Sequence, residues 1–154
     1  MQKLNLPQAD LKITTENGKT KIFDIIRKKY VVLTPEEQVR QEFIHYLINK
    51  KNYPKGLLAV EKKLKIYNLE KRTDIVLYNT SGNPAVIIEC KAPSVNISQK
   101  TFDQIARYNM NFKAEYLIVT NGIKHYCCKP DYKNKTYGFL KEIPDFEQIT
   151  NNKT

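Results

Sequence analysis

Three charged side chains at the ends of two apolar runs have the types needed for chemistry on a phosphate. Asp74 stands at the start of one run, and Glu89 and Lys91 follow the other run, residues 85–88. Side chains alternate across a strand, so Glu89 and Lys91 would share one face while Cys90 points to the other. A hairpin between the two runs would place Asp74 beside them. The sequence therefore predicts that these charges converge at the strand ends.

Two carboxylates and an ammonium group in this arrangement suit a hard divalent cation. Mg²⁺ binds one or two carboxylates and retains several of its waters. A cation held in this way can activate water and neutralise the charge that develops on a phosphate. The alternative is a surface ion pair between Glu89 and Lys91. The position of these charges directly after an apolar run favours the metal-site hypothesis.

A regular order of helices and strands must position these residues. Thr34, followed by Pro35 and then by Glu37, predicts the start of a helix with a capping box over residues 35–49. Ser98 is the expected cap of a second helix. After the first helix we expect strands at residues 57–67, 74–78 and 85–89, a helix at 98–112, and strands at 116–120 and 125–128.

This order predicts an α/β fold with a mixed β-sheet flanked by helices. The two strands joined by the turn at residues 79–84 should be antiparallel. The strand at residues 116–120 is uniformly apolar, so it should be central and should run parallel to its neighbour after a helical crossover. Asn17-Gly18 between two alternating runs predicts an N-terminal β-hairpin ahead of this core.

The length of 154 residues suits a single domain over residues 1–154. We expect an accessory hairpin within residues 1–30, a core over 31–130, and a polar, frayed tail over 144–154. The five glycines are too far apart for a Walker A loop, and the three cysteines include no C-x-x-C pair for a zinc ribbon. No apolar run approaches the ~20 residues of a membrane span, so we expect a cytoplasmic protein.

The charge of the chain predicts an anionic partner. There are 26 Lys and Arg residues against 16 Asp and Glu residues, and the net charge of +10 favours nucleic acid over acidic lipid. Eight basic and two acidic residues lie from Lys50 to Arg72, directly before Asp74. Such a segment can neutralise phosphates, although a charge run is also typical of a solvated face. The candidate DNA contacts are Lys62, Lys63, Lys65, Lys71 and Arg72.

The second predicted helix carries two polar residues that could face a cleft. Gln104 and Tyr108 lie one turn apart, away from the apolar stripe of the helix. That stripe consists of Phe102, Ile105, Ala106 and Met110. The alternative is an ordinary solvated face that includes a tyrosine.

The first predicted helix offers three acidic residues. If Val39, Phe43, Ile44 and Leu47 form its buried stripe, Glu36 falls near the middle of that stripe together with Arg40. Glu37 lies at the edge and has the capping role, whereas Glu42 points away. Glu36 is therefore our first choice for the acidic residue of this helix, and Glu37 the second.

Asp74 and the triplet Glu89-Cys90-Lys91 resemble the D…(D/E)-x-K motif of the PD-(D/E)XK nuclease superfamily. Within it, the chain resembles the N-terminal nuclease domain of the restriction subunits of type I restriction enzymes. The resemblance covers residues 30–128 and rests on five ordered blocks at residues 34–40, 71–76, 88–93, 104–108 and 119–122. Thr73 stands where the name of the superfamily places proline.

The resemblance implies a restriction-endonuclease-like core and assigns roles to the candidate residues. Asp74 and Glu89 would bind the metal, with the backbone carbonyl of Cys90 as a third ligand, and Lys91 would be the catalytic lysine. Gln104 and Tyr108 match a Q-x-x-x-Y motif of this branch of the superfamily, and the first helix would add an acidic residue, Glu36 by our choice.

The function that this resemblance implies is that of a metal-dependent deoxyribonuclease. Its cofactor would be Mg²⁺, with Mn²⁺ as a substitute, and its partners would be DNA and other restriction or DNA-processing subunits. The alternatives are a DNA-binding module with a nuclease fold but little turnover, and an interaction domain whose basic face contacts a protein or RNA.

Overall fold

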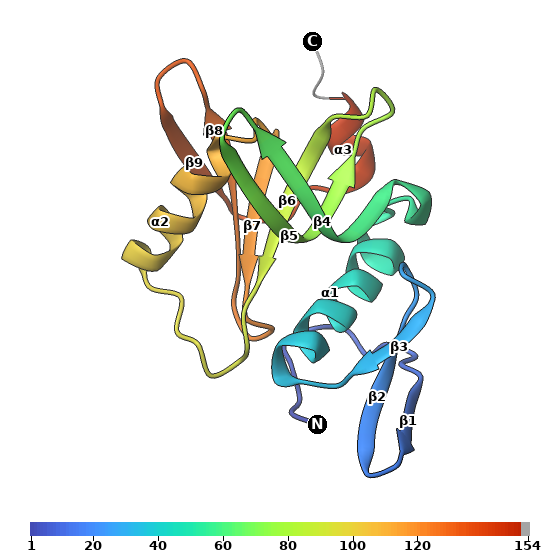
Figure 1. Cartoon of the computed structure of the whole chain (residues 1–154). Coiled ribbons are helices and arrows are strands. Elements are labelled where there is room, and N and C mark those ends of the chain that lie inside the picture. The colour runs from blue at the N-terminus through green and yellow to red at the C-terminus, as the bar shows by residue number, and fades with distance from the viewer. Residues whose placement is uncertain (152–154) are drawn as a thin grey trace.

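The computed structural model describes residues 1–151, which form two sheets and three α-helices (Figure 1). The smaller sheet consists of β1 (Ile13–Glu16), β2 (Lys19–Asp24) and β3 (Lys29–Val32). The larger sheet has the order β4-β5-β6-β7-β8-β9, and its strands are β4 (Leu58–Ile66), β5 (Leu69–Tyr78), β6 (Pro84–Cys90), β7 (Tyr116–Thr120), β8 (His125–Asp131) and β9 (Thr136–Leu140). The helices are α1 (Pro35–Lys51), α2 (Gln99–Met110) and α3 (Phe146–Asn151), and a 3-10 turn spans Lys55–Leu57.

The larger sheet is mixed, as the sequence predicted. β5 and β6 pair antiparallel, with Ile75 opposite Ile88. β6 and β7 pair parallel, with Ile88 opposite Ile118, and α2 forms the crossover between them. All five residues of β7 are buried, which confirms its central position. This order brings the ends of β5 and β6 together with the end of β7.

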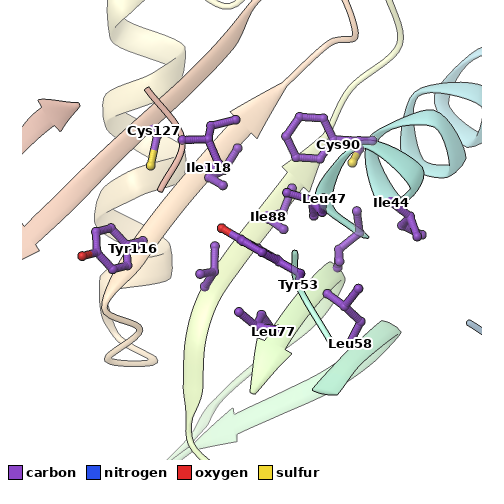
Figure 2. Close-up of a cluster of buried hydrophobic side chains, with 14 of the residues drawn as sticks. Ile44, Leu47, Tyr53, Leu58, Leu77, Ile88, Cys90, Tyr116, Ile118 and Cys127 are labelled. Carbon is purple, nitrogen blue, oxygen red and sulfur yellow. The ribbon is translucent and has the colours of Figure 1, made fainter. Parts of the chain in front are cut away.

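The two longer helices cover opposite faces of the larger sheet. Leu47 of α1 packs with Leu77, Ile88, Cys90 and Ile118 in one buried cluster (Figure 2). The same cluster includes Tyr53, whose hydroxyl donates to the carbonyl of Pro144 at 2.9 Å.

The second cluster lies under α2. Phe102 and Ala106 of the helix pack there with Val76, Ile87 and Leu117 of the sheet. These strand residues directly adjoin members of the first cluster in sequence, so successive side chains of β5, β6 and β7 point to opposite faces. Both faces of the strands that carry the predicted site are therefore packed.

The helix starts follow their predicted caps. The hydroxyl of Thr34 accepts from the backbone N–H of Glu37 at 3.0 Å, and the hydroxyl of Ser98 accepts from the backbone N–H of Thr101 at 3.1 Å. The reciprocal half of the predicted capping box does not form, because the Glu37 carboxylate bonds to Arg40 instead. Among residues 1–151, no helix has the length and apolarity to cross a membrane.

Two strands were missing from the prediction, and both are poorly marked in sequence. β3 has four residues, mostly exposed, and it turns the predicted hairpin into a three-stranded sheet that continues to Val32. β9 is an edge strand with little burial and pairs with β8, so the core extends past residue 130. Weakly buried strands of this kind lack the alternating pattern on which a prediction depends.

The segment after Pro144 also differs from the prediction of a frayed tail. It forms α3, where Ile149 is 1% exposed and joins the cluster under α1. The carboxylate of Asp145 accepts from the backbone N–H of Gln148 at 2.8 Å and fixes the first turn. Phe146 also packs against this cluster, so two apolar side chains dock α3. Residues 152–154 of the predicted tail lie outside the described part of the chain.

Candidate active site

The β5–β6 hairpin brings the predicted carboxylates together. Asp74 directly precedes Ile75 and Glu89 directly follows Ile88, the first pair in the register between these strands. The backbone N–H of Cys90 donates to Asp74 Oδ2 at 2.8 Å, which fixes the Asp74 side chain against β6. The sequence prediction that Asp74 lies beside the end of β6 is therefore confirmed as a matter of position.

Lys91 follows β6 at the point where β7 ends. Its backbone N–H donates to the carbonyl of Thr120 at 2.8 Å, so the parallel neighbour fixes its backbone. Its ammonium Nζ lies 3.7 Å from Glu89 Oε1, and the Lys91 side chain is 33% exposed. The ammonium group is therefore close to the carboxylates and also accessible from solvent.

A second lysine lies closer to Glu89 than Lys91 does. Lys71 Nζ donates to Glu89 Oε2 at 2.7 Å, and the Lys71 side chain is only 17% exposed. The ring of Tyr108 lies beneath this ammonium, with its centroid 5.6 Å from Lys71 Nζ. The sequence assigned Lys71 to DNA binding, whereas the structure makes it the main counter-ion of Glu89.

The two predicted residues of α2 have different surroundings. The Tyr108 hydroxyl donates to the backbone carbonyl of Glu70 at 3.3 Å and so ties α2 to the start of β5. Gln104 lies one turn earlier, is exposed, and its side chain makes no hydrogen bond to any other described residue. The structure therefore connects Tyr108 to Glu89 through Lys71 and leaves the Gln104 amide open to solvent.

The electrostatics of the hairpin make Asp74 a weak acid. Burial and the nearby charge of Glu89 raise the pKa of Asp74 to about 6, although the Cys90 N–H and Arg40 act in the opposite direction. Glu36 is exposed, and its charge also raises the pKa of Asp74. Asp74 therefore holds its proton more tightly than an exposed carboxylate does, mainly because it is buried and lies beside Glu89.

The position of Glu36 differs from the sequence prediction. Glu36 is exposed, whereas Glu37 and Arg40 are buried, so Glu36 is not within the buried stripe of α1. The first turn of α1 buries Glu37 and Gln38 instead: Arg27, which follows β2, donates to Glu37, and Gln38 donates to the carbonyl of Gln2. Glu36 stays exposed, and it is near enough to Asp74 for its charge to act on that carboxylate.

The sequence analysis placed Arg40 together with Glu36, whereas its partner on α1 in the structure is Glu37. Arg40 is 7% exposed and bonds to both oxygens of Glu37, at 2.8 and 2.7 Å. Its Nη1 also lies 3.5 Å from Asp74 Oδ1, and its Nη2 lies 3.3 Å from Glu61 Oε1. The spacing of Glu37 and Arg40 on the helix could have indicated the first contact, but no local signal indicates the contacts with β4 and β5.

The basic segment borders this site on β4 and β5. Lys62, Lys63, Lys65 and Arg72 are exposed. Lys63 bonds to Glu70 at 2.7 Å, and Arg72 lies 3.7 Å from Glu61. Lys62 and Lys65 form no ion pair with any residue in the described part of the chain.

The donor set fits a hydrated Mg²⁺ better than a fully protein-bound metal. Within residues 1–151 there is no group of three or more His, Cys, Asp or Glu side chains that could hold a metal ion. Asp74 and Glu89 supply two carboxylates, which is the number that Mg²⁺ takes when it keeps its waters. Burial and the charge of Glu89 raise the pKa of Asp74, and a bound cation would favour the ionised form of this carboxylate.

Comparison with known proteins places this geometry in context. Residues 35–144 match the family model described as "Type I restriction enzyme R protein N terminus". A fragment structure of a protein described as an HsdR subunit of a type I restriction enzyme from Vibrio vulnificus YJ016 matches with a TM-score of 0.52 at 15% identity. The match covers 77% of this chain but 25% of that chain, and at this identity it shows the shared fold. No curated protein matches the chain.

Proposed function

The chain belongs to the family of type I restriction enzyme R protein N-terminal domains, and on this basis we propose that it is a metal-dependent deoxyribonuclease. Its reaction would be hydrolysis of phosphodiester bonds in DNA. The observation that carries the proposal is the convergence of Asp74, in the middle of β5, with Glu89 and Lys91 at the end of β6, with the Cys90 N–H on Asp74 at 2.8 Å. Each of these side chains has a role that phosphodiester hydrolysis requires.

Asp74 and Glu89 would hold Mg²⁺, or Mn²⁺ in its place, with the backbone carbonyl of Cys90 as a further ligand. The bound cation would supply an activated water and would neutralise charge on the phosphate. The Cys90 N–H and the Arg40 guanidinium orient Asp74 for this role. Lys71 occupies Glu89 Oε2, so the cation would displace it from that oxygen.

Lys91 would act on the reacting phosphate itself. Its ammonium group lies within 4 Å of Glu89 and is partly exposed, so it can approach a phosphate that enters from solvent. A fixed cation at this place stabilises the negative charge of the transition state and orients the attacking water. Gln104 and Tyr108 would order the same site from α2, and Glu36 would contribute a carboxylate from α1.

The basic segment would hold the DNA backbone beside the site. Lys62, Lys63, Lys65 and Arg72 are exposed on the hairpin that carries Asp74, so phosphates bound there would lead the strand to Lys91. Affinity of this kind falls as the salt concentration rises. Since the chain corresponds to a quarter of the matched solved chain, other restriction subunits would supply the recognition of the DNA sequence.

A second function, a DNA-binding module with little turnover of its own, is favoured by one observation. Lys71 and Lys91 both approach Glu89, and Arg40 approaches Asp74, so cations of the chain already partner each carboxylate. A module of this kind would bind DNA through the same basic segment and would need no divalent metal.

One experiment separates the two functions. Supercoiled and linear DNA are incubated with the chain in Mg²⁺, Mn²⁺ or EDTA, beside the variants Asp74→Ala and Lys91→Ala. Asp10→Ala and Lys100→Ala are matched controls, because both side chains are exposed and lie away from the hairpin. A nuclease gives metal-dependent nicking that is lost in the two site variants and kept in the two controls. DNA binding without cleavage in any metal would establish the module instead.

A further inference from the structure

A groove lies between the tip of the β4–β5 hairpin and the C-terminal end of α2, outside the residues assigned above. It has a volume of about 440 Å³, within the range of ligand-binding pockets. The residues that give it its chemistry are Tyr67, Leu69, Met110, Arg107, Lys113 and Lys135. Tyr132 also lines the groove, with its ring centroid 4.7 Å from Lys113 Nζ. The groove therefore combines two tyrosine rings and an apolar floor with three cations.

Tyr67 is an unusual residue for the place that it occupies. It is 91% exposed, the largest exposed fraction of any large hydrophobic residue in the described chain. It also has a φ of 51° at the tip of the hairpin, a conformation in which Gly, Asn and Asp are the common residues. Neither burial nor turn geometry accounts for an aromatic ring at this position, so the ring is free to contact a ligand.

The charge of the groove selects an anion. Arg107, Lys113 and Lys135 line it, and none of its described lining residues is acidic. Arg107 shares its charge with Asp103 at 3.1 Å, but it also donates to the backbone carbonyl of Lys135 at 3.2 Å and so stays at the groove. A ligand that presents a flat apolar surface next to negative charge matches these walls.

The groove continues from the active site along the same face of β5. Leu69 lines the groove, and Lys71 contacts Glu89 two residues later, a rise of roughly 7 Å along the strand. On α2, Arg107 of the groove directly precedes Tyr108, whose ring lies beneath Lys71. A strand of DNA with a phosphate at Lys91 would therefore have its next nucleotides at this groove.

We propose that the groove binds unpaired nucleotides of the DNA strand, with a base stacked on Tyr67 and phosphates on Lys113 and Lys135. The proposal rests on the proposed function for its substrate, DNA, but it does not depend on hydrolysis. An exposed ring stacks on any base that is not already paired and stacked, whereas a duplex hides its base faces. The groove would thus give the chain a preference for single-stranded or frayed DNA beside the cleavage position.

The test is DNA binding in EDTA, where no metal-dependent cleavage can occur. Fluorescence anisotropy measures the affinity of the whole chain for a labelled 20-nucleotide oligothymidine and for a blunt duplex of equal length. The variants are Tyr67→Ala and Tyr67→Phe, and Tyr30→Ala is the matched control. Tyr30 is 46% exposed but lies on β3 of the smaller sheet. Both positions are exposed enough that the fold should tolerate the changes.

We expect Tyr67→Ala to weaken single-strand binding roughly tenfold, the cost of losing one stacked base, and Tyr67→Phe to bind like the unchanged chain. The duplex affinity and the Tyr30→Ala affinity should stay the same. The dependence on salt should not change in Tyr67→Ala, because the ring carries no charge. It should become shallower in a double variant, Lys113→Gln with Lys135→Gln, which removes two phosphate contacts.

Three results would overturn the proposal: unchanged single-strand binding in Tyr67→Ala, an equal loss in Tyr30→Ala, or an equal loss for the duplex. A failure of the proposed function would look different. If the chain never cleaves DNA but Tyr67→Ala still loses single-strand affinity, the groove assignment stands and the nuclease assignment does not.

Discussion

Two groups of carboxylates lie near α1, and their surroundings differ: the pKa values of Asp24 and Glu37 are lowered in the first group, whereas the pKa of Asp74 is raised in the second. In the first group, which we call the arginine cluster, Asp24 and Glu37 bind Arg27 and Arg40. In the second, the hairpin pair, Asp74 lies beside Glu89 at the strand ends. Burial disfavours the charged form of Asp24, Glu37 and Asp74, most strongly at Asp74, and the two groups also differ in their partners.

The carboxylates of the arginine cluster have many donors. Asp24 accepts from the backbone N–H groups of Ile26 and Arg27 and from the Arg27 guanidinium at 2.6 Å. These hydrogen bonds outweigh its burial and lower the pKa of Asp24. Glu37 receives bonds from Arg40 and from Gln41, and its pKa is lowered in the same way. Groups that are satisfied to this extent hold the structure together.

The hairpin pair has fewer donors for its charge. Asp74 has one backbone N–H at 2.8 Å and one guanidinium at 3.5 Å, and its pKa rises to about 6. A carboxylate that the fold leaves incompletely neutralised can gain from an external cation. The comparison therefore separates acidic residues that stabilise the chain from the acidic residues that we propose for its chemistry.

The largest expected effect is on cleavage, from changes in the hairpin pair. Asp74→Asn and Lys91→Ala should each reduce the rate of metal-dependent nicking by about 10³-fold, since each removes a group that acts on the transition state. Asp74→Asn keeps an acceptor for the Cys90 N–H and removes repulsion from Glu89, so its melting temperature should not fall. Nicking rates and thermal unfolding measure the two quantities. A fall in stability that matches the loss of activity would contradict the separation of the two groups.

A change at Arg40 should affect stability more than cleavage, because Arg40 bonds more closely to the arginine cluster than to the hairpin pair. Arg40→Met leaves the buried Glu37 without its main partner and should reduce the free energy of unfolding by about 3 kcal/mol. Urea denaturation measures the change. Arg72→Met is the control: its side chain is 63% exposed, and a change below about 0.5 kcal/mol is expected. Equal losses of unfolding free energy in the two variants would show that the burial of Arg40 does not increase its contribution to stability.

Asp24→Asn should cost about 2 kcal/mol of unfolding free energy at neutral pH, because it removes charge-assisted hydrogen bonds. The pKa of Asp24 is lowered from 3.8 in the folded chain, so the stabilisation is present above pH 3.8 and is lost as the pH falls through the folded value. Urea denaturation from pH 7 to pH 3 should show the two chains converging in the acid range. A difference that stays constant with pH would exclude the carboxylate charge as its source.

The smallest expected effect concerns Lys71, which holds the Glu89 oxygen that a cation needs. Lys71→Gln removes a partly exposed ion pair worth about 1 kcal/mol, so Mn²⁺ affinity without DNA should rise roughly fivefold. Isothermal titration calorimetry measures the Mn²⁺ affinity. Lys63→Gln breaks the exposed pair with Glu70 and should leave the Mn²⁺ affinity unchanged. A lower affinity in Lys71→Gln would show that Lys71 prepares the site for the metal.

The sequence predicted the hairpin pair but not the arginine cluster, and the reason is physical. Asp74 and Glu89 flank apolar runs of adjacent strands, so alternation and one turn suffice to place them together. The arginine cluster joins β2 to α1, and both of its arginines also contact Glu61 of β4. Glu61 has a φ of 52° that no local pattern indicates. Contacts between elements far apart in sequence depend on tertiary packing, which hydrophobic periodicity does not predict.

The helix residues show the same limit on a smaller scale. The buried stripe of Val39, Phe43, Ile44 and Leu47 was predicted and is confirmed. The prediction for Glu36 was wrong about burial, because the first turn of α1 buries Glu37 and Gln38 instead, against Arg27 and the N-terminal segment. Periodicity predicts which face of its own helix a residue occupies. Which element packs against that face depends on the rest of the chain.

The parallel pairing of β6 with β7 has a consequence for the order of folding. β5 and β6 are joined by a short turn, so Asp74 and Glu89 can meet through local contacts. β7 can pair with β6 only after the chain has passed through α2, and such non-local pairing is slow to form. The amides of β5 and β6 should therefore become protected from hydrogen exchange before those of β7. The acidic half of the site would form first, and the backbone bond that fixes Lys91 to Thr120 would complete it later.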